Sequence, residues 1–152
     1  MIDCCPNCTA RKQPGYVYVH MIDYGLSTEQ HYPYNSSISH SEPGECRTAE
    51  KRKNYRISEW HDISSCSALS DRLALSPVVV HVDARTWRNY QGGILTECGT
   101  VRNHYALLVG RGIGFWKIRN SWGKLWGEHG HIRIKSGNTC GICTRGSYVA
   151  LE

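Results

Sequence analysis

The stretch "NSWGKLWGEHGHIRIK", residues 120–135, contains two Trp-Gly pairs and one asparagine ahead of an alternating segment. In that segment basic residues and histidine alternate with Ile132 and Ile134, which is the pattern of a β-strand with one face exposed to water. A strand of this kind does not need two large indole rings beside Asn120. The stretch therefore indicates that Asn120 serves another polar group elsewhere in the chain.

A histidine stands at the start of a neighbouring predicted strand. Residues 104–110, "HYALLVG", and 115–121, "FWKIRNS", have the pattern of strands joined by a short glycine turn, so we expect them to pair. Pairing would bring His104 within reach of Asn120, whose amide oxygen would fix the tautomer and plane of the imidazole ring. A purely structural hydrogen bond between the two is the alternative.

The two tryptophans of the opening stretch lie close to this asparagine in the sequence. Trp122 and Trp126 each precede a glycine. Large indoles beside an amide can exclude water and so strengthen its hydrogen bond. The alternative is that they are ordinary aromatic residues of a core or an interface.

The remaining pattern divides the chain into two parts near Ser76. Helical periodicity, with a serine cap before the second helix, precedes this point, and β-branched residues follow it. A loop composition fills residues 31–46. The further predicted elements are helices at 14–25 and 64–77 and strands at 77–84 and 147–151. Helices followed by strands indicate the α+β class.

Composition limits the classes of function. The chain has 152 residues, enough for one domain or for part of a larger one, and its formal net charge is +5. Its densest basic run, residues 51–53, is accompanied by no nucleic-acid motif, so we interpret it as a solvated loop and expect no nucleic-acid partner. No apolar run is long enough for a membrane span, and the first residues do not resemble a signal peptide.

Eight cysteines in a chain of this size favour disulfides and an oxidising compartment. Two CxxC sequences, at residues 5–8 and 140–143, offer a zinc or redox site as the alternative. Their separation is far larger than that of ordinary zinc modules. The remaining histidines lack the spacing of metal ligands, and we interpret them as ordinary polar residues: His61, His81, His129 and His131. We expect no metal and no cofactor.

The segment "NHYALLVGRGIGFWKIRNSWGKLWGEHGHIRIKSGNTCGI" closely resembles the C-terminal part of the papain-like cysteine peptidases. Weaker similarities in "MIDCCPNC", "YGLSTEQHYPY", "SPVVVHVDA" and "YQGGILTEC" extend the resemblance over nearly the whole chain. The resemblance implies a papain-like α+β fold. Residues 77–152 would form a nearly complete β-barrel half, and residues 1–76 a partial helical half that lacks the central helix. Together they would form one incomplete domain.

The resemblance also implies roles for individual residues. His104 matches the catalytic histidine and Asn120 the asparagine that orients it. Trp122 matches the indole that shields their hydrogen bond, and Trp126 a wall on the leaving-group side. Asn103 and Arg145 stand near positions that shape the substrate pocket, where an arginine is unusual.

Two family disulfides are implied as well, Cys4 with Cys46 and Cys98 with Cys140. Each would close a loop and stabilise the fold by about 4 kcal/mol in the chain-entropy model. The resemblance gives no partner within this chain to the other four cysteines: Cys5, Cys8, Cys66 and Cys143.

One part of the family pattern has no match in the chain. The nucleophilic cysteine of the family lies in a segment at the start of the central helix, and the resemblance covers only about the last two thirds of the catalytic unit. Cys5 and Cys8 match disulfide positions rather than that helix start. We therefore expect a pseudoenzyme, a truncated peptidase homologue that is inactive alone and serves in structure or interaction. The alternative is the C-terminal chain of an active cysteine endopeptidase whose cysteine is on another chain.

The missing helix implies a partner. Without it, we expect several apolar side chains of the first predicted helix to be partly exposed: Tyr16, Val17, Tyr18, Met21 and Ile22. The partner would be an upstream peptidase half or a larger assembly, and a peptide substrate would bind only if the site were completed. The family and the cysteines together favour a lysosomal or secreted location.

Overall fold

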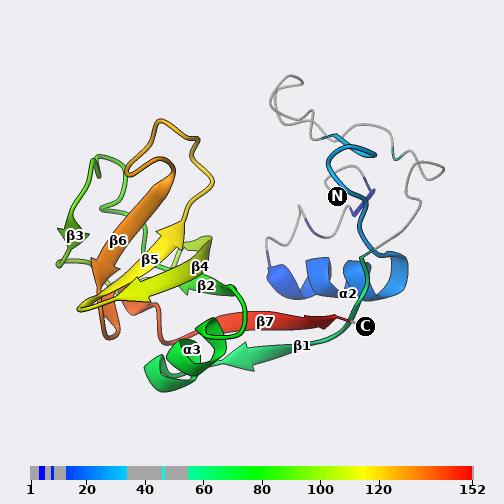
Figure 1. The fold of residues 1–152 in the computed structure, drawn as a ribbon, viewed down its shortest axis with the longest axis horizontal. Helices are drawn as coiled ribbons and strands as arrows, with labels where there is room; N and C mark the ends of the chain where they lie inside the picture. The colour runs from blue at the N-terminus through cyan, green and yellow to red at the C-terminus, as the bar shows by residue number, and fades with distance from the viewer. Residues whose placement is uncertain (1–3, 6–7, 9–12, 34–45, 47–54, 152) are drawn as a thin grey trace. The chain divides into compact units, whose positions relative to one another are not determined.

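The computed structural model describes residues 4–5, 8, 13–33, 46 and 55–151 (Figure 1). The chain forms two compact units, one of Met1–Trp60 with Val149–Glu152 and the other of His61–Tyr148. The boundary after residue 76 that the sequence suggests between a helical and a β-barrel half remains a prediction. The candidate site lies within the second unit.

The strands form a seven-stranded sheet in the order β1-β7-β2-β4-β5-β6-β3. Their bounds are β1 Ile57–Ile63, β2 Val78–Val82, β3 Ile94–Leu95, β4 His104–Gly112, β5 Phe115–Arg119, β6 His131–Lys135 and β7 Gly146–Leu151. The pairings β2–β4, β4–β5 and β5–β6 are antiparallel, whereas β3 runs parallel to β6. Figure 1 shows β4, β5 and β6 side by side. The predicted α+β class is thus confirmed.

Burial alternates along β2 and β6, so one face of the sheet packs into the core. In β2 the residues Val78, Val80 and Val82 are fully buried, and in β6 the same holds for Ile132 and Ile134. β-Branched side chains fit a pleated, half-buried surface. Leu108 and Ile118 add to the same core from β4 and β5. The predicted strands at 77–84, 104–110, 115–121, 131–135 and 147–151 are all present, whereas β1 and the short β3 were not predicted.

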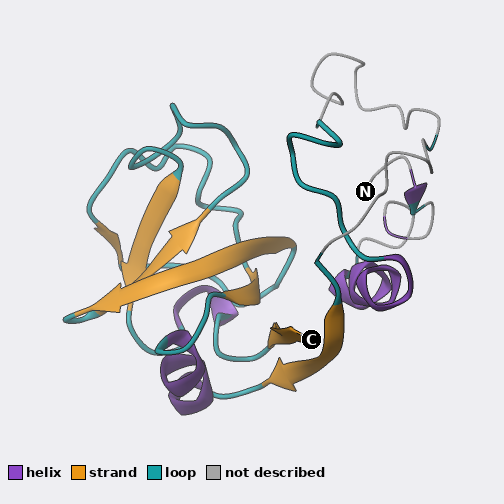
Figure 2. Ribbon diagram, turned by 45° about the vertical axis from the view of Figure 1, so that its right-hand side comes forward, coloured by secondary structure: helices purple, strands orange, loops and turns teal. Residues whose placement is uncertain are grey.

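Two short helical elements accompany the sheet in the second unit. The α3 helix spans Cys66–Leu73, and the Ser65 hydroxyl accepts a hydrogen bond from the Ala68 N–H as the predicted serine cap. Leu69 of α3 is fully buried in the core. A single 3-10 turn, η3, covers Thr139–Gly141. Figure 2 distinguishes these helical elements from the strands by colour.

The first unit contains the α2 helix, Pro14–Tyr24, which the sequence predicts with Pro14 at its start. Gly25 ends it with φ 71°, a value that favours glycine. The expectation that Tyr18 is partly exposed is wrong, because its side chain is only 5% exposed and its ring lies 5.4 Å from that of Trp60. The other apolar residues expected to be exposed there are half-buried: Tyr16, Val17, Met21 and Ile22.

Several expectations lie partly or wholly outside the described residues. Residues 34–45 of the predicted loop and the basic run at 51–53 belong to this group. Among the residues that are described, no helix has both the length and the apolar character needed to cross a bilayer.

Candidate active site

His104 and Asn120 meet because of how two strands pair. His104 begins β4, Asn120 follows directly after β5, and the antiparallel register aligns Leu107 with Arg119. The Nε2 atom of His104 lies 2.8 Å from Oδ1 of Asn120, which is a hydrogen bond. An amide oxygen can only accept, so Nε2 carries the hydrogen and the lone pair of the neutral imidazole lies on Nδ1. The ring is thereby held with one nitrogen available to take a proton.

The backbone around Asn120 holds its side chain in place. Its Oδ1 also accepts from the Ser121 N–H at 2.8 Å, and its own N–H donates to the Gly130 carbonyl at 2.9 Å. Its Nδ2 is buried and has no partner among the residues described here. The amide thus directs its oxygen toward His104 while its nitrogen remains unpaired, an arrangement that costs stability and needs a compensating role.

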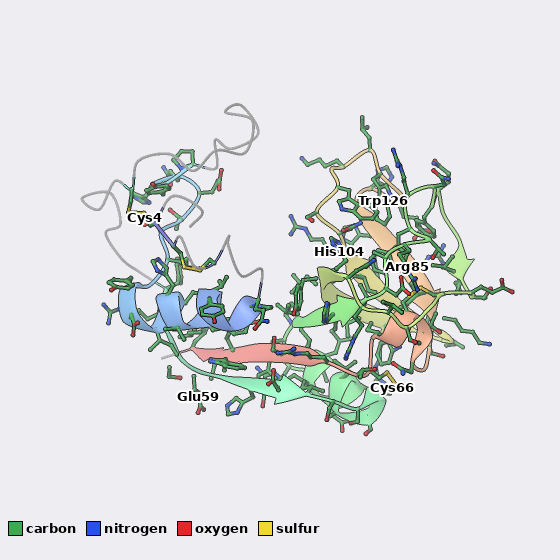
Figure 3. All side chains as sticks on the ribbon, turned by 180° about the vertical axis from the view of Figure 1, so that it is seen from behind. Cys4, Glu59, Cys66, Arg85, His104 and Trp126 are labelled. Carbon is green, nitrogen blue, oxygen red and sulfur yellow. A yellow bond between two sulfur atoms is a disulfide. The ribbon has the colours of Figure 1, made fainter. Side chains whose placement is uncertain are left out.

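Two indole rings border His104, and a third packs against both of them. The ring centroid of Trp122 lies 5.1 Å from that of His104, and the centroid of the buried Trp87 ring lies 6.1 Å from that of His104, with the two ring planes nearly perpendicular. Trp126 packs against both indoles and donates its Nε1–H to the Trp87 carbonyl at 3.2 Å. Figure 3 labels His104 and Trp126 in the same part of the second unit. Apolar rings in these positions lower the local dielectric and strengthen the His–Asn bond.

The loop that carries the tryptophans is fixed by an ion pair. The guanidinium of Arg133 donates to both carboxylate oxygens of Glu128, at 2.6 to 3.1 Å, and the Gly93 N–H donates to Glu128 at 3.0 Å. These bonds, led by that of Arg133, lower the pKa of Glu128 to about 2. The carboxylate is therefore ionised throughout the neutral range and anchors the loop to β6.

One Trp-Gly pair has a strict steric reason. Gly127 has φ 54°, and a Cβ placed on it would lie 2.6 Å from the His131 carbonyl and 2.9 Å from the Tyr90 ring. Only glycine tolerates this combination of backbone conformation and close approach. The glycine that follows Trp126 thus lets the loop turn back onto β6.

Each of the two expected pocket residues directly precedes a strand. Asn103 precedes β4, and its Oδ1 accepts from the Ala84 N–H at 3.0 Å. Arg145 precedes β7, is exposed, and its carbonyl accepts from the His81 N–H at 3.0 Å. Asp83, which precedes Ala84, is buried and paired with Arg85, whose hydrogen bonds lower the pKa of that carboxyl.

The surroundings of His81 differ from those expected of an ordinary polar residue. The His81 ring stacks on that of Tyr105 with centroids 4.2 Å apart and 10° between the planes. Burial, followed by the charges of Arg102, Arg145 and His104, lowers the pKa of His81. The one feature of the sequence that points to this position is that a histidine interrupts the valines of β2.

All eight cysteines form disulfides. Cys4 is bonded to Cys46 and Cys98 to Cys140, the two pairs that the family resemblance predicts. Two pairs were not predicted, Cys5 with Cys8 and Cys66 with Cys143. A zinc site would need thiolates, and each of these sulfur atoms is bonded to another sulfur instead.

Known proteins are similar to this chain in sequence. The family model described as "Papain family cysteine protease" matches residues 1–150. "Cathepsin L 1" and "Cathepsin L 2" of Paramecium tetraurelia are each 41% identical over 135 residues, which is 88% of this chain and 41% of each relative. The chain therefore spans less than half the length of these two relatives.

Solved structures share the fold. Digestive procathepsin L 3 of Tenebrio molitor has a TM-score of 0.81 at 31% identity, with 99% of this chain and 53% of that chain covered. The Carica candamarcensis cysteine protease CMS1MS2, solved in complex with E-64, has a TM-score of 0.85 at 29% identity, with 98% and 74% covered.

Proposed function

Because the chain belongs to the papain family of cysteine proteases, we propose that it carries the histidine side of a cysteine-protease site and is catalytically inactive by itself. One observation carries the proposal. Every cysteine of the chain is in a disulfide, so no thiolate is present for His104 to activate. A disulfide sulfur is not a nucleophile, and a base without its nucleophile contributes little to hydrolysis.

In this form the chain serves in structure or interaction. A second protein segment, either an upstream peptidase half or a larger assembly, would pack where the family has its central helix. The half-buried apolar residues of α2, such as Val17 and Ile22, support this partner. A peptide would meet the His104 surface once that segment is in place.

A second candidate function has its own support. The His104–Asn120 hydrogen bond of 2.8 Å and the indoles around it retain the geometry that general-base catalysis requires. Such a geometry would suit a cysteine endopeptidase whose thiol comes from outside this chain. In that case His104 would take the proton of the thiol through Nδ1 and Asn120 would hold the ring during the transfer. Trp126 would border the leaving-group side, while Asn103 and Arg145 would contact the substrate.

Inactivity of the chain alone is tested directly. One sample of the purified, non-reduced chain is unfolded and titrated with a thiol reagent. Separate folded samples are incubated with fluorogenic peptidyl amides or exposed to a thiol-reactive activity probe. We expect no free thiol, no hydrolysis above the buffer rate and no labelling. Hydrolysis that disappears in the His104→Ala variant would contradict the proposal, because a thiolate would then be present on this chain.

The second candidate is tested by completing the site. A chimera joins the upstream part of Paramecium tetraurelia "Cathepsin L 1", which this chain does not match, to the chain. If the His–Asn pair is competent, the chimera hydrolyses peptidyl amides and its His104→Ala variant loses at least about a thousandfold in rate. A folded chimera without activity would exclude a catalytic role for this pair and leave the structural role.

A further inference from the structure

His81 lies where three strands of the second unit come together. It is the fourth residue of β2 and stands directly opposite Tyr105 in the register of β4. Its backbone N–H donates to the carbonyl of Arg145, the residue before β7. The stacked His81 and Tyr105 rings, 4.2 Å apart, form a flat aromatic pair. Arg145 is thus held beside this pair by its own backbone.

Internal hydrogen bonding does not explain a histidine at this position. The Nδ1 atom of His81 is buried, and it has no hydrogen-bond partner among the described residues. A histidine retained for the fold normally has both its nitrogens satisfied or exposed to water. A valine in its place would continue the pattern of β2 without leaving a buried polar atom unpaired. The imidazole therefore calls for a role outside the packing of the sheet.

The surroundings of His81 are positively charged and unbalanced. The charges of Arg102, Arg145 and His104 all act on its ring. Within the described part of the chain, the ion pairs join Arg85 to Asp83 and Arg133 to Glu128, so neither Arg102 nor Arg145 has a carboxylate partner there. Asp83, two residues from His81, is already neutralised by Arg85. An anionic group that approached this site would find free guanidinium donors.

This charge lies next to the proposed base. Tyr105 follows His104 in β4, and His104 itself stands opposite Val82, the residue after His81. A peptide whose scissile bond reached His104 would therefore bring one of its side chains to the aromatic pair. We infer that His81, Tyr105 and Arg145 bind an acidic side chain of that peptide, with the carboxylate on the Arg145 guanidinium and the methylene groups on the stacked rings. This inference rests on the proposed peptide-binding role of the His104 surface.

The test measures binding, so it does not depend on catalysis. The chimera that supplies the upstream segment, as its inactive His104→Ala variant, is titrated with blocked tripeptides that carry Glu, Gln or Lys at the central position, and the ring signals of His81 and Tyr105 are followed by NMR. We expect the Glu peptide to bind about tenfold more tightly than its neutral isostere Gln, with the Lys peptide weakest, and to shift both rings. Equal affinities, or shifts that avoid these two rings, would overturn the inference.

Variants separate a specific contact from general attraction. Arg145→Gln should bring the Glu and Gln peptides to equal affinity, and Arg145→Lys should keep part of the preference because it keeps the charge. Lys117 is an exposed residue of β5, and Lys117→Gln removes a positive charge away from the aromatic pair. This variant should leave the preference for the Glu peptide unchanged. If Lys117→Gln lowers the preference as much as Arg145→Gln, the effect is that of net charge and the inference is wrong. Failure of the chimera to hydrolyse peptides would count against the second candidate function, while these affinities would still decide the inference.

Discussion

The Nε2 atom of His104 lies 2.8 Å from the Oδ1 atom of Asn120 across 16 residues of sequence. The pairing of β4 with β5 produces this contact, and the indole of Trp122 borders it. Both features belong to the second unit alone. The histidine, its orienting amide and the indole beside them therefore lie in one unit of the structure. Each can be tested by a separate substitution.

Loss of the amide should free the imidazole. In Asn120→Ala the Nε2–H of His104 loses its acceptor, so its proton should exchange with water much faster and its NMR signal should broaden or vanish. In an active chimera the rate should fall by roughly tenfold to a hundredfold, since the ring must then find its orientation during each turnover. Asn120→Gln is the conservative control. A ring signal as sharp in Asn120→Ala as in the native chain would mean that the amide does not hold His104.

Stability should fall in acid because of Glu128. Its folded-state pKa of about 2 lies below the ordinary value of 4.5, so the carboxylate stabilises the fold fully above pH 4.5. That contribution is lost as the pH falls from about 4.5 to about 2. Because the pair is partly exposed to solvent, we expect Glu128→Gln to lower the free energy of unfolding by about 1–2 kcal/mol at neutral pH.

The measurement is urea unfolding at a series of pH values. Across this acid range the stability curve of Glu128→Gln should be flatter than that of the native chain. Glu97→Gln, at an exposed position, serves as the control and should keep the native slope. Parallel curves for the native chain and Glu128→Gln would show that this carboxylate does not contribute.

Two glycines of the tryptophan loop should differ in their tolerance of a methyl group. Gly127→Ala would force a Cβ to within 2.6 Å of the His131 carbonyl at φ 54°, so it should destabilise the chain by more than about 2 kcal/mol. Gly123→Ala has positive φ but no atom within 4 Å of the new Cβ, and should cost about 1 kcal/mol. Thermal unfolding of both variants, with the fluorescence of the indoles, compares them. Equal losses would contradict the steric argument.

The disulfide between Cys66 and Cys143 ties α3 to the segment after η3 across 77 residues. In the chain-entropy model, replacing both cysteines by serine should lower the free energy of unfolding by about 4 kcal/mol. Serine replacement of Cys5 and Cys8, which are 3 residues apart, opens a much shorter loop and should cost only about 2 kcal/mol. Denaturant unfolding without reductant gives both values, and a larger loss in the second variant would reverse the expected order.

The ring of His81 should report the charge of Arg145. Burial lowers the pKa of His81, and Arg102, Arg145 and His104 lower it further, because each disfavours a second positive charge nearby. Arg145→Gln should therefore raise this pKa toward its ordinary value of 6.5, whereas Lys117→Gln should leave it unchanged. An NMR titration of the His81 ring protons measures both. With a folded-state value below that of the unfolded chain, the imidazole destabilises the fold as the pH falls below 6.5, and Arg145→Gln should reduce that loss.

Local patterns were sufficient for much of the fold. The alternation of Ile132 and Ile134 predicts β6, the valines of β2 predict a buried strand, and a proline and a glycine mark the ends of α2. These signals depend on residues a few positions apart, which the sequence shows directly. The strand β1 was missed because "ISEWHDI" lacks strict alternation, and its two buried residues are its ends.

Only part of the candidate site could be predicted from local patterns. His104 and Asn120 could be paired in advance, because a short turn joins their strands and a short turn implies antiparallel pairing. The pairs Cys5–Cys8 and Cys66–Cys143 could not, since spacing does not say which sulfurs meet. The expected exposure of Tyr18 was wrong because Trp60, far along the chain, packs against it.

The sequence by itself determined the class of the fold, the family, and the histidine and asparagine that face one another, because each rests on a local pattern or on adjacent strands. Only the tertiary structure decided that all eight sulfurs are consumed in disulfides, and that His81 stacks on Tyr105 beside Arg145, which has no carboxylate partner in the described part of the chain. Those relationships join segments distant in the chain, and the distance between such segments is set by packing of the whole core rather than by any short stretch of residues.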